Sequence, residues 1–139
     1  MKIAFDTNVL LDILCDRAPF AEPASRILAM VETGALAGCV CATSITTIFY
    51  LARKTIGVAA ARKQVRLLLT LLEVLPVNRR VLETALTSPL SDFEDAVITE
   101  AAYQSTVDAI VTRNEKDFKK SRVPVYSPQA LLAALGSIE

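Results

Sequence analysis

The sequence predicts one α/β domain, a five-stranded parallel sheet with helices on both faces, and three observations carry this prediction. Short apolar runs alternate along the chain with longer stretches whose apolar residues recur at helical spacing. Strands and helices that alternate in this way are typical of a parallel sheet buried on both faces. The chain has 139 residues, 53% of them hydrophobic, and no repeat or linker divides it, so we expect a single domain.

The strands are the short apolar runs, and the helices are the periodic stretches between them. We predict strands at residues 3–5, 36–42, 73–77, 107–111 and 123–126. We predict helices at residues 9–14, 22–33, 43–57, 58–72, 79–86, 91–104 and 128–135. Pro19 indicates a loop around it, Thr43 or Ser44 is expected to cap the third helix, and the polar segment 112–122 is predicted to be a loop.

Charge and hydropathy exclude several classes of protein. Lysine plus arginine and aspartate plus glutamate each number 15, so nucleic-acid binding would need a local basic patch. No apolar run approaches the roughly 20 residues of a membrane span. Asp6 follows Lys2 too closely for a signal-peptide segment, and we expect a cytoplasmic protein without membrane contact.

The chain has three cysteines and no histidine. The lack of histidine excludes histidine-based catalysis and the usual histidine-containing zinc sites. Cys39 and Cys41 alternate along a predicted strand and are expected to be small core residues. Free thiols of this kind fit a reducing cytoplasm.

Asp6 ends the first predicted strand and has two interpretations. With Thr7 and Asn8 it could form the turn and N-cap of the next helix. Alternatively it is the first member of an acidic site, because ligands bind at the carboxyl ends of strands in open α/β sheets, and a buried carboxylate is costly unless something binds it.

A second acidic stretch spans residues 91–95. Ser91 and Glu94 have the spacing of a capping box, which gives Glu94 a structural role. Asp92 and Asp95 then share one face of the helix. The helix dipole alone could explain Asp92, so Asp95 is the better site candidate.

The fourth strand also ends in polar residues, namely Thr112, Asn114 and Asp117. If this strand neighbours the first, they converge with Asp6 and Thr7, while Asp95 comes from the intervening helix. Carboxylates without histidine or cysteine suit Mg²⁺ or Mn²⁺. Asp117 could instead be a solvated loop charge, and Asp108, at the opposite end of the strand, is expected to be structural.

A metal site of this kind is suited to phosphodiester chemistry. Bound Mg²⁺ or Mn²⁺ can activate a water and stabilise charge during in-line displacement, with a carboxylate or metal-bound hydroxide as the base. Arg113, Lys116 and Lys119 lie beside the presumed site and supply the positive charge that phosphate contacts require, although basic loop residues are more often only solvated.

Three motifs, at residues 3–10, 91–96 and 111–118, together resemble the PIN-domain ribonuclease family. The likeness implies a PIN-like nuclease domain over residues 1–139 with strand order 3-2-1-4-5. It also implies a metal-dependent endoribonuclease, often the toxin of a VapBC-type toxin–antitoxin pair. By position, Asp6 and Asp95 resemble the principal metal ligands, and Asp117, with Asn114 and Thr112, resembles the final polar part of the site.

The sequence departs from the family at one place. The family commonly has a glutamate in the helix after the second strand, whereas residues 44–50 contain no acid, and Thr47 is the best match for that position. Asp92 is a candidate to compensate as a metal ligand. The missing acid keeps open an alternative, a catalytically weakened PIN-fold module that binds RNA or protein.

Two further hypotheses concern nucleotides and partners. A nucleotide-binding or phospho-acceptor domain is disfavoured because no glycine-rich loop follows the first strand. Apolar residues of the helices at 27–31 and 49–51 could form an interface, covered by an antitoxin or by a second copy in a homodimer, or they could simply fill the core.

Overall fold

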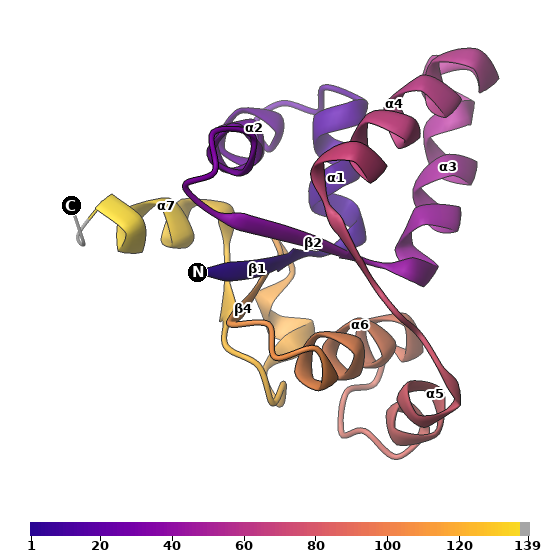
Figure 1. Ribbon diagram of the computed structural model, residues 1–139, viewed down its shortest axis with the longest axis vertical. Coiled ribbons are helices and arrows are strands. Elements are labelled where there is room, and N and C mark those ends of the chain that lie inside the picture. Colours follow the sequence, from indigo (N-terminus) through magenta and orange to yellow (C-terminus); the bar gives the residue numbers. More distant parts are fainter. Residues whose placement is uncertain (137–139) are drawn as a thin grey trace.

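Five parallel strands form one sheet in the computed structural model, which describes residues 1–136 (Figure 1). The strands lie in the order β3-β2-β1-β4-β5, and each neighbouring pair is parallel. Their bounds are β1 Lys2–Phe5, β2 Ala37–Cys41, β3 Glu73–Leu75, β4 Ala109–Val111 and β5 Val125–Tyr126. The predicted fold class and strand order are confirmed.

Helices cover both faces of the sheet, as Figure 1 shows. On one side lie α1 Thr7–Leu14, α2 Ala21–Glu32, α3 Ala42–Ile56, α4 Val58–Leu71 and α7 Pro128–Gly136. On the other side lie α5 Arg79–Leu86 and α6 Phe93–Gln104. Within residues 1–136, no helix is both long and apolar enough to cross a membrane.

Both faces of the sheet are buried, because successive residues of each strand point to opposite sides. Ile3 and Phe5 pack in the core on the α1 side, whereas Ala4 packs in the core on the α6 side. Cys39 and Cys41 are fully buried in that second core. The expectation that both cysteines are small core residues is therefore confirmed.

Several element boundaries differ from the prediction by one or a few residues, and two differences change the expected local structure. The N-cap of α3 is Cys41, without a side-chain hydrogen bond. The expected caps at Thr43 or Ser44 are therefore wrong; α3 starts earlier, and Ser44 is fully buried in its first turn. The predicted loop at 112–122 contains a 3₁₀ helix, η1 Glu115–Phe118, and Phe118 is buried in the core.

Strand β1 lies in the middle of the sheet, with β2 on one side and β4 on the other. Phe5 pairs with Val40 of β2 and with Val111 of β4. The next residue, Asp6, still donates its backbone N–H to the Val111 carbonyl at 2.9 Å. Strands β1 and β4 therefore end side by side, and the segments that follow them start at one place.

Candidate active site

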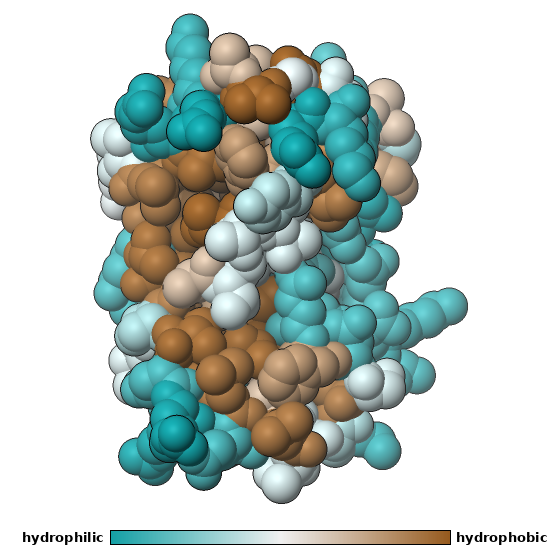
Figure 2. Space-filling view, turned by 90° about the vertical axis from the view of Figure 1, so that its right-hand side faces the viewer, coloured by the Kyte–Doolittle hydropathy of each residue, from teal (hydrophilic) through white to brown (hydrophobic). Residues whose placement is uncertain are grey.

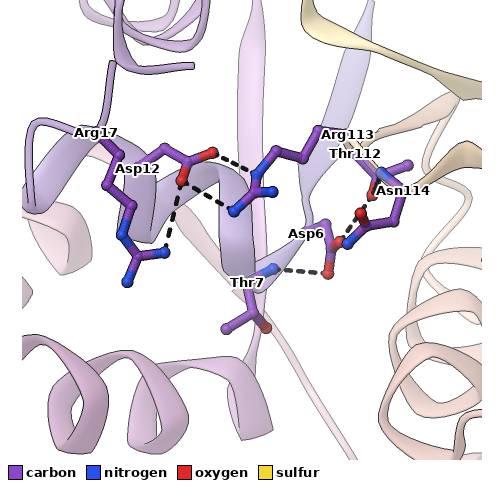
Figure 3. Close-up of polar contacts among 7 residues, drawn as sticks. All are labelled: Asp6, Thr7, Asp12, Arg17, Thr112, Arg113 and Asn114. Carbon is purple, nitrogen blue, oxygen red and sulfur yellow. Dashed lines mark hydrogen bonds and ion pairs between the residues drawn. The ribbon is translucent and has the colours of Figure 1, made fainter. Parts of the chain in front are cut away.

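Asp6 lies at this strand end and is only 3% exposed (Figure 3). The backbone N–H of Thr7 donates to its Oδ1 at 2.8 Å, and the Thr112 hydroxyl donates to its Oδ2 at 2.7 Å. The Thr112 Oγ1 in turn accepts the Asn114 N–H at 3.0 Å. Asp6 is thus the N-cap of α1, as the first interpretation has it, and it is also tied to the loop after β4.

A cavity of about 220 Å³ opens beside Asp6. Its walls come from the β1–α1 junction, α3, the start of α6 and the η1 loop. The lining residues are Asp6, Thr7, Asn8, Thr47, Leu51, Asp92, Glu94, Asp95, Asn114 and Asp117. All except Leu51 and Glu94 are candidates from the sequence, so the fold brings three distant motifs to one cavity. Asp117 is exposed but lies on its wall.

Glu94 is the carboxylate that the sequence analysis assigned to the wrong role. The N-cap of α6 is Asp92, whose Oδ1 accepts the Asp95 N–H at 3.0 Å, and Ser91 is not the cap. With the cap one residue later, Glu94 is the second helical residue and not the third, so it has no capping-box geometry. Instead Glu94 Oε1 accepts the Thr7 hydroxyl at 2.8 Å and lines the cavity.

Burial and neighbouring carboxylates raise the pKa of two acids of the cavity, Asp95 and Asp6. Burial, together with the charges of Asp6, Asp92, Asp117 and Glu94, raises the pKa of Asp95 to about 7. Burial also raises the pKa of Asp6, although the hydrogen bonds from Thr112 and Thr7 oppose this. Negative charge is therefore crowded here, and a cation would relieve it.

No arginine or lysine neutralises these acids: the ion pairs found within residues 1–136 include none of the five cavity carboxylates. Oxygen donors of this kind fit a hard divalent cation such as Mg²⁺ or Mn²⁺. As the side chains stand, no three or more acidic or cysteine residues in the described part of the chain are spaced to hold a metal ion. The oxygen donors therefore fit a divalent cation in their chemistry, but the acids line the cavity without forming a complete set of metal ligands.

Arg113, expected to contact RNA, is held by another buried acid (Figure 3). Its Nε lies 2.8 Å from Asp12 Oδ2, and its Nη2 lies 3.3 Å from Oδ1. Arg17 Nη1 lies 3.6 Å from the same Oδ1. The Arg113 guanidinium also stacks on the Phe20 ring, 4.3 Å from its centroid, so this side chain is fixed in place while remaining 28% exposed.

Lys116, Lys119 and Asp108 do not line the cavity. Lys116 of η1 and Lys119 just after it are exposed and line a separate surface hollow of about 500 Å³. Asp108 lies before β4, where its Oδ2 accepts the Lys2 N–H at 2.7 Å. This contact, at the opposite end of the sheet, agrees with the structural role expected for Asp108.

The family follows from a direct comparison, in which a model described as PIN domain matches residues 2–116. The chain belongs to the PIN-domain family. No curated protein matches the chain. Solved structures do resemble this PIN domain, and their low sequence identities make the likeness one of fold.

Three of these structures illustrate it. A chain of VapBC2 from Rickettsia felis, bound to a promoter DNA fragment, has a TM-score of 0.70 at 12% identity over 91% of this chain and 98% of that one. A chain of a toxin–antitoxin complex from Klebsiella pneumoniae has a TM-score of 0.68 at 22% identity, and the match covers 91% of this chain and 97% of that one. VapC20 from Mycobacterium tuberculosis, a sarcin-ricin loop cleaving toxin, has a TM-score of 0.64 at 16% identity, and the match covers 78% of this chain and 86% of that one.

Proposed function

We propose that this PIN domain is an endoribonuclease that depends on Mg²⁺ or Mn²⁺ and acts as the toxin of a toxin–antitoxin pair in the cytoplasm. The observation that carries the proposal is the set of carboxylates that meet at the carboxyl ends of β1 and β4 without a cationic partner among the described residues. Similarity in fold to a toxin that cleaves the sarcin-ricin loop supports the choice of RNA.

Each side chain of the site has a proposed role. Asp6, Asp95 and Asp117 hold the metal, and Asp92 adds a carboxylate at the rim. The metal, when bound, supplies positive charge against the phosphodiester and makes water a better nucleophile. Thr112 orients Asp6 through its 2.7 Å hydrogen bond.

Polar neighbours complete the site. One of its carboxylates accepts the proton of the attacking water. Asn8, Thr47 and Asn114 offer uncharged oxygen and nitrogen groups on the cavity wall. These side chains can orient water or substrate without adding charge.

The RNA would approach over the η1 loop. Arg113 is fixed by Asp12, and Lys116 and Lys119 are exposed on and just after η1, which also brings Asp117 to the cavity wall. Cations on this side attract the phosphate backbone, whose contacts position RNA without reading its sequence.

Incubation of total RNA with the protein and Mn²⁺ tests the proposal. Wild type should cleave, while EDTA or Asp6→Asn should lower the rate at least about a hundredfold, since several kcal/mol of transition-state stabilisation depend on the metal. Asp108→Asn is the matched control and should cleave like wild type, because Asp108 lies at the other end of the sheet. Equal cleavage by wild type and Asp6→Asn would overturn the proposed site.

A second candidate function is a non-catalytic module that binds RNA or protein. The uncharged Thr47 in α3 favours it, and the acids retained around Asp6 oppose it. In the same assay this alternative predicts that no cleavage depends on Mn²⁺, whereas RNA binding persists in EDTA.

An apolar surface supports a protein partner. Figure 2 shows hydrophobic side chains over much of the face that carries α3, α4 and α5. Tyr50 and Leu51 of α3 and Val58, Leu67 and Leu69 of α4 are 40–56% exposed, and apolar side chains gathered on one face often mark an interface. We expect a second copy of the chain or an antitoxin segment to cover it, and light scattering of the purified protein should report the mass of a homodimer.

A further inference from the structure

Helix α3 lacks the acid that the resemblance to PIN nucleases leads one to expect. Residues 42–56 contain neither aspartate nor glutamate. Thr47, the best match for the position, lines the cavity, but its hydroxyl only approaches the Thr43 carbonyl of its own helix at 3.5 Å. This wall of the cavity therefore has no charge from α3.

Glu94 of α6 is linked to α3 through the side chain of Thr7. Its Oε1 lies 2.8 Å from Thr7 Oγ1, which in turn lies 2.9 Å from the Oγ of Ser44 in the first turn of α3. The Thr7 hydroxyl is the donor in both contacts and has a single proton, which an ionised Glu94 carboxylate can only accept. The two buried hydroxyls form a relay that links α3 to the Glu94 carboxylate through Thr7.

We infer that Glu94 of α6 stands in for the missing α3 glutamate as a metal-ligating carboxylate, and that the Ser44–Thr7 hydroxyl pair positions it. The inference rests on the proposed function, since it assigns a residue to the same metal site. The bond to Thr7 occupies only Oε1, so Oε2 is available to a cation in the cavity that both Glu94 and Asp95 line.

Asp92 is the weaker substitute. Its Oδ1 already accepts the Asp95 N–H as the cap of α6, and its side chain is exposed at the rim. Glu94 is more buried than Asp92 and is held by a side-chain hydrogen bond that crosses between two helices. A ligand held in this way needs less ordering when a metal binds.

Direct titration with Mn²⁺ by calorimetry, without RNA, tests the inference. Glu94→Gln keeps the hydrogen-bond acceptor for Thr7 and removes the charge, so it should fold normally and bind Mn²⁺ about tenfold or more weakly. Glu115→Gln removes one exposed acid from the neighbouring η1 helix and should leave the affinity unchanged.

A swap of the acid between helices makes the test more specific. Adding Thr47→Glu to Glu94→Gln places the carboxylate on α3 and should restore most of the affinity. If Glu94→Gln binds Mn²⁺ like wild type while Asp6→Asn does not, the inference is wrong and the proposed function stands. If the swap recovers nothing, Glu94 does not replace an α3 acid. If wild type itself binds no Mn²⁺, the proposed function fails as well.

The positioning role of Thr7 has its own control. Thr7→Ser keeps the hydroxyl and should bind Mn²⁺ like wild type, whereas Thr7→Val removes it and should weaken binding several-fold. Equal affinities for the two variants would show that the hydroxyl relay does not position Glu94.

Discussion

Asp6 caps helix α1 and Asp12 lies within it, and the two are almost equally buried, 3% and 1% exposed, yet their surroundings are opposite. Asp12 has two arginines, Arg113 at 2.8 Å and Arg17 at 3.6 Å. Asp6 has only hydrogen bonds from Thr7 and Thr112 and, in the described residues, no ion pair. The chain neutralises one acid with its own cations and leaves the other for a cation from outside.

The same contrast occurs along α6. Near its end, the buried Glu100 pairs with Arg122 at 3.2 Å. At its start, Glu94 and Asp95 line the cavity, and burial together with the nearby acids raises the pKa of Asp95. Among the described residues, the buried acids Asp12 and Glu100 are thus paired with arginines, whereas the acids that line the cavity form no ion pair. This difference separates residues that hold the fold together from residues that hold the proposed metal.

The largest change in stability is expected for Asp12→Asn. The amide would face two guanidinium groups without charge, and breaking a buried pair whose arginines are partly exposed should cost about 2–3 kcal/mol of unfolding free energy. Asp16→Asn, an exposed change in the following loop, should stay within about 0.5 kcal/mol of wild type. Urea unfolding measures the free energy of unfolding of both variants. If Asp12→Asn loses no more of it than Asp16→Asn, the arginines around Asp12 do not stabilise the fold, and the difference from Asp6 disappears.

In metal-free protein, Asp6→Asn should change the free energy of unfolding in the opposite direction to Asp12→Asn and by a smaller amount. Asparagine also caps helices well and keeps an acceptor for Thr7 or Thr112, while the cost of burying an unpaired charge disappears. The free energy of unfolding in EDTA should therefore be equal to or higher than that of wild type. A clear destabilisation by this substitution would mean that the Asp6 charge serves the fold.

Stability of the metal-free protein should fall as pH rises from about 4 to about 7. The pKa of Asp95 is about 7 in the folded protein and about 3.9 in an unfolded chain. Between these values the folded state binds more protons, so unfolding becomes easier as pH rises. Asp95→Asn should flatten this part of the curve in EDTA. An unchanged pH dependence would contradict the crowding of charge around Asp95.

The smallest effects are expected in the basic loop. Lys119→Ala should weaken RNA binding a few-fold in EDTA and lower the salt slope by about 0.7, the value for one phosphate contact on a single strand. Lys63→Ala, an exposed change on α4, is the control and should change neither quantity. Fluorescence anisotropy at several salt concentrations measures both variants, and equal slopes would place the RNA elsewhere.

Much of this picture follows from the sequence because it depends on local patterns. The alternation of apolar strands and periodic helices indicates the parallel sheet, and polar residues after two of the strands indicate where a site lies. Asp6, Asp95 and Asp117 could be singled out because each stands beside a strand end or in the first turns of a helix.

The remaining features depend on contacts between distant residues. Ser91 and Asp92 are both residues that cap helices well, and the spacing of Ser91 and Glu94 matches a capping box. In the structure Asp92 is the cap instead, and Glu94 accepts a hydrogen bond from the distant Thr7. The pairing of Asp12 with Arg113, residues 101 positions apart, leaves no local signal. The charged cluster and its shifted pKa values arise only when the motifs meet.

The Mn²⁺ dependence of the unfolding free energy, measured in parallel for wild type, Asp6→Asn and Asp12→Asn, tests the central claim most directly. A metal that binds only the folded state adds about 1.4 kcal/mol for each tenfold rise in its concentration above the dissociation constant. We predict this rise for wild type, the same rise from a lower baseline for Asp12→Asn, and none for Asp6→Asn. A flat response of wild type, or an equal rise in Asp6→Asn, would contradict a metal site centred on Asp6.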